Sequence, residues 1–319
     1  MPARRFLMLV KEEAWGVPME EPTAGTDSFY LRLGDGTDLG ENPIIQEVPY
    51  GGGRTTAACA WSDQGENGGT LNTLLYPGQA PLFLHWWLTN INTGRTTPWA
   101  TDNDGLQPPG DVASVSIYEA IQESDGSYTR KAYRGCKVNS GTLSAQQDGA
   151  ARAWQLALQI MAGAVEADID TEEFPDPAET DYPCGPYLYS HLSGGLKIAT
   201  TRNMVDSVSF SADNGLEGQY FVSKAPLRIN SYGRNTTLSV GLARLKSPDD
   251  FADFKAVIAK DTELTLNNGT KSVKIDLHTN NHWQTMGRRL PDGSYYAWDG
   301  VLKNKWDASQ GTDLTVTAA

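Results

Sequence analysis

Carboxylates beside aromatic rings are the residues of this sequence whose types and spacing could do chemistry. Asp63 follows Trp61 by two positions, and Asp299 follows Trp298 directly. Two carboxylates on either side of a glycosidic bond can hydrolyse it, one of them as the acid. The same pattern is also typical of rings packed beside a solvated acid. A carboxylate-based hydrolase is therefore one alternative for this chain, with Asp63 and Asp299 as its first candidates.

The histidines and the glycine-rich segment indicate no further reactive site. His278 and His282 are four residues apart, but Asn280-Asn281 lies between them where a predicted strand ends, and no Cys or carboxylate stands beside them at a metal-site spacing. Gly51–Arg54 has the composition of a phosphate cradle, yet a predicted strand follows it instead of a helix. We therefore expect no catalytic residue, no metal and no cofactor.

Charge and composition narrow the function classes. The 319 residues include 39 Asp and Glu against 26 Lys and Arg, a net charge of -13. Such a chain is a poor nucleic-acid binder, because phosphate contacts need Lys and Arg clusters. Its three cysteines predict free thiols in a reducing compartment. The longest strongly apolar stretch, 80–88, is too short to span a membrane. Lys11-Glu12-Glu13 follows the apolar start at once, which argues against a signal peptide.

The elements that must position these residues are mostly strands. Two stretches predict helices: 81–88, and a segment that Ser247 and Pro248 begin and that carries Phe251 and Phe254 on one face. Elsewhere apolar and polar residues alternate, which is the period of a half-buried strand. The alternating stretches are 29–33, 44–48, 115–121, 154–160, 205–211, 227–230, 237–242 and 273–278. The sequence therefore predicts a mainly β protein of the α+β class.

Four short motifs recur in the same order in the two halves of the chain, which indicates a tandem duplication. They pair Asp27–Leu31 with Asp206–Phe210, Tyr50–Thr56 with Tyr232–Thr237, Ser114–Ile117 with Ser272–Ile275, and Asp125–Tyr128 with Asp292–Tyr295. We accordingly expect an N-terminal arm over 1–25, a first β domain over 26–165, a connector over 166–200 and a second β domain over 201–319.

The arm and the connector are the segments we expect to act outside the two domains. The apolar arm residues Phe6, Leu7, Met8, Leu9 and Val10 are a natural clamp for a neighbouring copy, so their deletion is expected to impair stacking more than folding. Residues 166–182 carry eight acidic residues and no basic one, with two prolines. Self-repulsion and proline predict an extended connector. Its acids are Glu166, Asp168, Asp170, Glu172, Glu173, Asp176, Glu179 and Asp181.

Several stretches resemble the tail tube proteins of long-tailed, siphovirus-like bacteriophages. Lys11–Pro18 resembles the start of that family, in which an acidic residue precedes a Gly-Thr or Gly-Val turn. The steps Gly53–Thr55 and Gly68–Leu71 look like the family as well. Tyr133–Ser144 is similar to the family's Gly-Cys-x-Val-x-Ser-x-x-Leu strand, and Val205–Ser211 is similar to the same strand.

The resemblance implies a structural protein, the major tail tube subunit, made in the host cytoplasm and located in the virion tail. In that family each domain is a β-sandwich with a flanking helix, and sheets of neighbouring domains join into an inner barrel. A ring needs six such domains, so a chain with two would form a homotrimeric ring with pseudo-sixfold symmetry, and rings would stack into a hollow tube.

The implied partners are other copies of the chain, the tape measure protein in the lumen, and the tail terminator and distal tail proteins at the ends. DNA would pass through without specific binding, since an acidic protein repels phosphate. No membrane is implied. A carbohydrate-binding or adhesive β-sandwich of a virion or cell surface is the first alternative, and the hydrolase above is the second.

Overall fold

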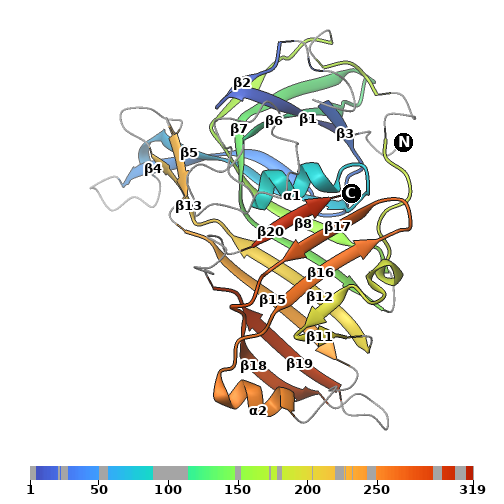
Figure 1. The fold of residues 1–319 in the computed structure, drawn as a ribbon. Helices are drawn as coiled ribbons and strands as arrows, with labels where there is room; N and C mark the ends of the chain where they lie inside the picture. Colours follow the sequence, from blue (N-terminus) through green and yellow to red (C-terminus); the bar gives the residue numbers. More distant parts are fainter. Residues whose placement is uncertain are drawn as a thin grey trace.

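The computed structural model describes most of the chain as antiparallel sheet (Figure 1). The described residues are 5–20, 22, 28–49, 57–88, 114–147, 152–171, 174–177, 182–202, 204–219, 226, 228–231, 233–242, 249–289, 297–305 and 314–318. The mainly β class predicted from the alternating pattern is confirmed.

In its described residues, the first half of the chain contains nine strands and one helix. The strands are β1 Arg5–Ala14, β2 Val17–Pro18, β3 Ser28–Leu31, β4 Asp38–Pro49, β5 Ala57–Leu74, β6 Val115–Gln122, β7 Tyr128–Gln146, β8 Gln155–Ala162 and β9 Ala164–Ala167. The helix, α1, runs over Ala80–Leu88 between β5 and β6. The prediction of a helix over 81–88 is therefore confirmed.

The part of the second half that the structure describes contains eleven strands and a second α-helix. A 3₁₀ helix over Tyr189–Leu192 precedes them. The strands are β10 Leu196–Ile198, β11 Thr200–Thr201, β12 Val205–Asp213, β13 Leu216–Gln219, β14 Arg228–Ser231, β15 Asn235–Leu242, β16 Thr262–Asn267, β17 Ser272–Asp276, β18 His282–Arg289, β19 Ala297–Lys303 and β20 Thr315–Ala318. The helix, α2, covers Asp249–Ala256, so the second predicted helix is also present, although Val257 and Ile258 lie beyond its end.

Each half of the chain contributes four strands to one shared layer and one five-stranded sheet to a second layer. One long antiparallel layer, which we call the large sheet, has the order β4-β5-β8-β7-β12-β15-β19-β18. Two five-stranded sheets cover it: β3-β1-β6-β7-β9 from the first half and β11-β10-β16-β17-β20 from the second. A single apolar cluster lies between the layers and includes Leu71, Leu158, Phe210 and Leu238, all fully buried.

The strand order repeats once along the chain. In the large sheet, each half places its strands as first, second, fourth and third, and in each half the helix follows the second strand. The two five-stranded sheets match strand for strand when β1 is set against β10 and β9 against β20. We call Arg5–Ala167 the first repeat and Leu196–Ala318 the second repeat.

Two of the four motif pairs that predicted a duplication do not occupy equivalent places in these repeats, and the other two pairs include Tyr50–Thr56 and Asp292–Tyr295, which lie outside the described residues. Ser28–Leu31 lies in β3, whose counterpart is β11, whereas Ser207–Phe210 lies in β12. Ser114–Ile117 precedes and enters β6, whose counterpart is β16, whereas Ser272–Ile275 lies in β17. The repeats also begin one strand earlier than the predicted domain starts at 26 and 201, because β1 and β10 belong to the five-stranded sheets. Short strand and turn motifs recur too often to fix the register of a diverged repeat.

β7 passes from one layer to the other and bends near Gly135. Its first part pairs with β6 and β9, and its second part pairs with β8 and β12. Gly135 has φ +64°, and a Cβ there would lie 2.6 Å from the Trp15 ring nitrogen. The buried Glu12 carboxylate accepts the Gly135 N–H at 2.7 Å and the Ser116 hydroxyl at 2.7 Å. These contacts fix the bend, because only glycine fits this conformation and this space.

β4 and the first part of β5 form a two-stranded ribbon that extends beyond the layers (Figure 1). β8 pairs with β5 only from Asn67 to Leu74, so the preceding part of β5 has β4 as its partner. In the second repeat, the short hairpin of β13 and β14 lies in the chain between β12 and β15. The first repeat has the ribbon at the corresponding place, where the chain passes from β4 to β5. Both repeats thus extend a hairpin on the same side of the body.

Candidate assembly interface

The large sheet has one apolar face and one open polar face. Along β8, Leu156 and Leu158 are buried while Gln155, Ala157 and Gln159 are exposed, which is the alternation of a strand with one side in the core. Neighbouring strands keep this phase because the register aligns their polar positions. One aligned row runs Asn72, Ala157, Thr142, Ser211, Thr237, Lys303, and the next runs Leu74, Gln155, Ser144, Ser209, Ser239, Val301.

The polar face is built mainly from small uncharged side chains. Ser211 and Thr237 share a hydrogen bond of 2.7 Å across β12 and β15, and Gln159 donates to Thr70 at 2.8 Å across β8 and β5. A shallow depression of about 230 Å³ lies on this face where the two repeats meet. Ser, Thr and Gln side chains make up most of the central rows, so this part of the face presents hydroxyl and amide dipoles instead of a strong charge.

The two repeats join edge to edge through β7 and β12. Seven residue pairs, from Ser207 with Gln146 to Asp213 with Ser140, form a continuous antiparallel ladder. The third strand of the first repeat thereby meets the first strand of the second repeat. The chain itself therefore contains one complete joint between two copies of the same four-stranded layer.

The two outer edges of the large sheet are formed by the strands that correspond to the two sides of this joint. Among the described residues, β4 pairs only with β5, and β18 pairs only with β19. β4 is the first strand of its repeat and β18 is the third strand of its repeat. They correspond to β12 and β7, so one edge of the chain is complementary to the other. Unpaired sheet edges readily add another strand.

The comparison with known families decides what this arrangement belongs to. A family model described as phage tail tube protein matches residues 2–315, nearly the whole chain. The chain belongs to the phage tail tube protein family. Members of that family are structural components of the virion tail, and the resemblance seen in the sequence is thereby confirmed. The search of curated proteins found no match. Within the described residues, no helix is long and apolar enough to cross a membrane.

In this tail tube protein the predicted arm residues lie inside the fold. Phe6, Leu7, Met8, Leu9 and Val10 are at most 5% exposed, and β1 pairs with β6 on one edge and with β3 on the other. Leu7 and Leu9 face the main core, whereas the alternate residues face a second apolar cluster. The expectation of an arm outside the domains does not match this placement. A clamp role for these residues stays a prediction, and it would require β1 to leave its sheet.

The predicted connector is docked along the outer face of the first repeat. Glu166 lies in β9 and pairs with Arg134 at 2.8 Å, and Asp176 pairs with Arg130 at 2.6 Å. Between them, Phe174 is fully buried against Phe6 and other rings of the second apolar cluster. Asp168 and Asp170 lie in the described part of this segment, whereas Glu172, Glu173, Glu179 and Asp181 lie outside it. In its described residues, a buried ring and two ion pairs hold this segment against the first repeat, and its role as a connector stays a prediction.

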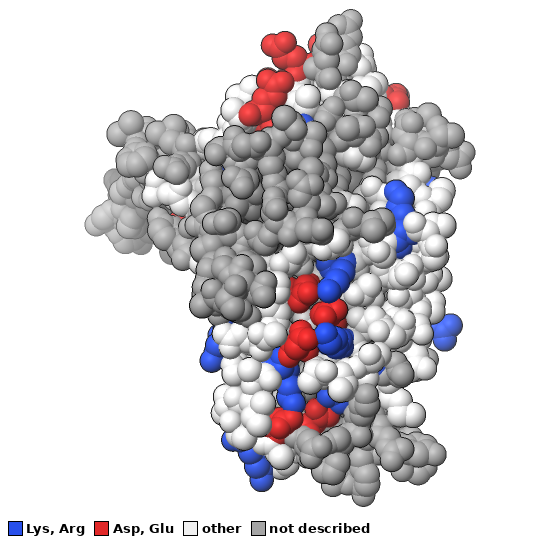
Figure 2. Space-filling view, viewed as in Figure 1, with Lys and Arg blue, Asp and Glu red and all other residues white. Residues whose placement is uncertain are grey.

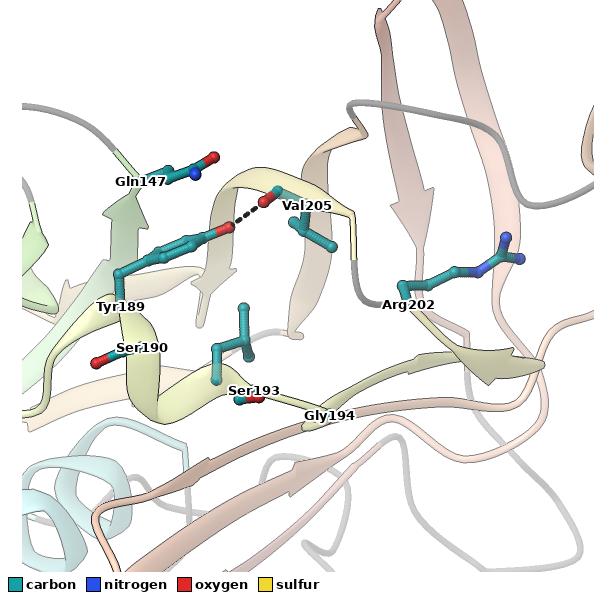
Figure 3. Close-up of a pocket in the computed structure, with 8 residues that line it drawn as sticks. Gln147, Tyr189, Ser190, Ser193, Gly194, Arg202 and Val205 are labelled. Carbon is teal, nitrogen blue, oxygen red and sulfur yellow. Dashed lines mark hydrogen bonds between the residues drawn. The ribbon is translucent and has the colours of Figure 1, made fainter.

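A pocket marks the point where the connector enters the second repeat (Figure 3). Tyr189 donates to the Val205 carbonyl at 2.6 Å, and burial, with a smaller effect of Asp206, raises the Tyr189 pKa to about 12. Arg202 turns away from the tyrosine and holds the buried Asp250 of α2 with two bonds of 2.7 Å. The hydrogen bonds around this pocket of about 240 Å³ therefore hold the 3₁₀ helix, β12 and α2 together.

The remaining candidate groups for chemistry are spread over the fold. Asp299 is exposed on β19, and the backbone of Asp63 lies in β5, while Gly51–Arg54 falls outside the described residues. His282 contacts the Val257 carbonyl and Asn280, and the His278 ring contacts Thr315. The two histidines lie at the two ends of the connection between β17 and β18.

Asp261, Glu263 and Asp276 are the carboxylates that converge in the described residues, and lysines already occupy their centre. Lys197 contacts Asp261 and Glu263 at 2.7 Å, and Lys274 contacts Glu263 and Asp276 at 3.0 Å. The hydrogen bond from Lys197 is the main cause of a lowered Glu263 pKa. Figure 2 shows this mixed patch of acidic and basic side chains over β16 and β17. It is a network of surface ion pairs.

Sequence reasoning missed the two complementary edges and the polar face. The signal for the face was present, because the polar positions of Val205–Ser211 and Thr237–Leu242 are mostly Ser and Thr instead of charged residues. The edges carried no comparable signal, since whether a strand is last in its sheet depends on contacts distant in sequence.

Proposed function

We propose that three copies of this chain form a ring with pseudo-sixfold symmetry, and that stacked rings form the tail tube through which phage DNA passes. The observation that carries the proposal is the edge-to-edge joint between β7 and β12. Each chain supplies two equivalent four-stranded layers already joined in this way, and the family is a structural one. A closed ring removes the two free edges of the large sheet, and such edges expose open sheets to aggregation.

The ring closes when β18 of one chain pairs with β4 of the next. All pairs in the large sheet are antiparallel, so strand direction alternates across its eight strands and the outer two run in opposite directions. Their approach therefore repeats the antiparallel geometry of the internal joint. Because third and first strands meet in both cases, every joint around the ring is the same kind of contact.

The polar face of the large sheet is the surface that lines the lumen. The other face packs in the core under the two five-stranded sheets, so only the polar face is open along all of its central strands. Its Ser, Thr and Gln side chains offer DNA phosphates no Lys and Arg cluster to bind. The tape measure protein would occupy the same lumen during assembly, and the terminator and distal tail proteins would meet the two ends. No enzymatic step is part of this role.

Electron microscopy of the purified chain at rising concentration tests the proposal. We expect rings or hollow tubes whose averaged end views show threefold symmetry with six similar lobes. A chain that remains monomeric at high concentration, and that is absent from purified tails, would contradict it.

A further inference from the structure

The two helices occupy the same place in their repeats, yet only one of them is covered. α1 and α2 each follow the second strand of the large sheet and contact the strand that is third in their repeat, β7 or β18. The α1 side chains Phe83, Trp86 and Trp87 are completely buried. In contrast, Phe251 is 37% exposed, and Val257 and Ile258 just beyond α2 are 59% and 48% exposed.

The second repeat supplies the cover of α1. β20 contacts α1, and Trp87 donates its ring N–H to the Ala212 carbonyl at the end of β12. Asn214 donates to the Trp87 carbonyl at 2.8 Å, and Arg234 donates to the Leu88 carbonyl. The carbonyls at the end of α1 are therefore bonded by residues beside β12 and β15. This cover comes with the β7–β12 joint, since the same strands provide both.

We propose that an exposed apolar face docks on the first repeat of a second copy of this chain. Phe251 in α2 and Val257 and Ile258 just beyond its end form this face. The inference rests on the proposed ring. If β18 pairs with β4 as β7 pairs with β12, the first repeat of the next copy stands beside α2 as the second repeat stands beside α1. β9 is the counterpart of β20, and it is exposed, with β7 as its described partner.

The backbone at the end of α2 supports this assignment. Val257 has φ +54°, a left-handed conformation that is strained for a β-branched residue. Its N–H bonds to the Phe254 carbonyl and the Ile258 N–H bonds to the Asp253 carbonyl, which is the helix ending that usually carries glycine at this position. The isolated chain gains little from an exposed valine there. Burial of the Val257 side chain by a partner accounts for an apolar residue at this position.

Three α2 variants and one control test the contact. Phe251→Ser and Ile258→Ser change exposed side chains, so we expect unaltered circular dichroism. We expect the concentration needed for half-assembly to rise about tenfold for each, the scale of losing one well-buried interface side chain. Val257→Gly is expected to raise the melting temperature of the unassembled chain while weakening assembly. Lys271→Ser, on the exposed β16–β17 turn, is the matched control and should assemble like the wild type.

Hydrogen exchange gives a second readout of the same contact. Amides of 249–258 should exchange more slowly in assembled rings than in the free chain. If wild-type rings form but the α2 variants assemble equally well, or exchange in 249–258 is unchanged, the α2 contact is wrong and the ring stands. A wild-type chain that never forms rings overturns the ring and this contact together.

Discussion

The two repeats of this tail tube protein share a strand order but differ in what covers them. In the first repeat, α1 is enclosed by the second repeat, and the outer face of the five-stranded sheet is covered by the docked connector with Phe174. In the second repeat, α2 is largely open, and the outer face of its five-stranded sheet carries the Lys197–Glu263–Lys274 network. The helix of the first repeat is covered within the chain, and the helix of the second repeat is left largely exposed.

This difference teaches how a duplicated chain can build a ring. In the proposed ring every repeat needs a neighbour on each side, and the first repeat receives from its own chain the neighbour that covers its helix. The second repeat must receive that neighbour from another copy. The four predictions below test the covered and the open regions of the two repeats, in order of decreasing expected effect.

Removal of β1 should have the largest effect. We expect deletion of residues 1–10 to abolish cooperative unfolding of the chain, because β1 supplies five residues at most 5% exposed to two apolar clusters. Circular dichroism during thermal unfolding measures this. Deletion of residues 1–4 is the control and should leave the transition in place. A folded chain that has lost residues 1–10 and only fails to stack would restore the clamp hypothesis.

Truncation of one aromatic residue in each helix compares the covers directly. Trp87→Ala should lower the free energy of unfolding by about 4 kcal/mol, because it leaves a large cavity and removes a buried hydrogen bond. Phe251→Ala should cost about 1 kcal/mol or less in the unassembled chain, since its side chain is 37% exposed. Urea unfolding below the assembly concentration measures both. Equal losses would contradict the difference in cover between α1 and α2.

The connector should be held more by its buried ring than by its ion pairs. Phe174→Ala is expected to cost about 3 kcal/mol and to open residues 168–183 to proteolysis, because the ring packs against Phe6 and Tyr118. Asp176→Asn should cost about 0.5 kcal/mol, since that carboxylate is 63% exposed. Limited proteolysis with urea unfolding distinguishes the two variants. If the Asn variant is cleaved as fast as the Ala variant, charge holds the segment.

Acidification should have the smallest effect and should act on the second repeat. The folded Glu263 pKa is lowered, chiefly by the Lys197 hydrogen bond, so this carboxylate contributes stability that is present above its ordinary value of 4.5. That contribution is lost as pH falls through the lowered folded pKa. Glu263→Gln should therefore reduce the fall in melting temperature below pH 4.5. An identical pH profile for the variant and the wild type would exclude the network as a source of acid sensitivity.

Sequence reasoning succeeded where the signal is local. The helix over 81–88 and the strand alternation of Val205–Ser211 depend on spacing within a few residues, and the structure has both. The family resemblance at Tyr133–Ser144 was also local, and the family match confirms it. The joint that this same stretch makes with β12 depends on a strand more than 60 residues away, which no local pattern specifies.

The misplaced segments show what local composition leaves out. Residues 6–10 precede the first repeat motif and have no counterpart in the second half, which predicted an arm, yet a continuous apolar strand is what a position buried on both faces requires. Among the acids of the connector, Ile169 and Phe174 are the apolar residues whose side chains are buried in the second apolar cluster. The acidic residues indicate which side of that segment faces solvent, but the acidic composition does not indicate which side chain docks.

The mass of the smallest closed ring tests the central claim most directly. Native mass measurement of rings assembled from the purified 34.7 kDa chain should give three copies, since each supplies two of six repeats. A ring of six copies would contain twelve repeats and would contradict the equivalence of the β7–β12 joint with the joints between chains.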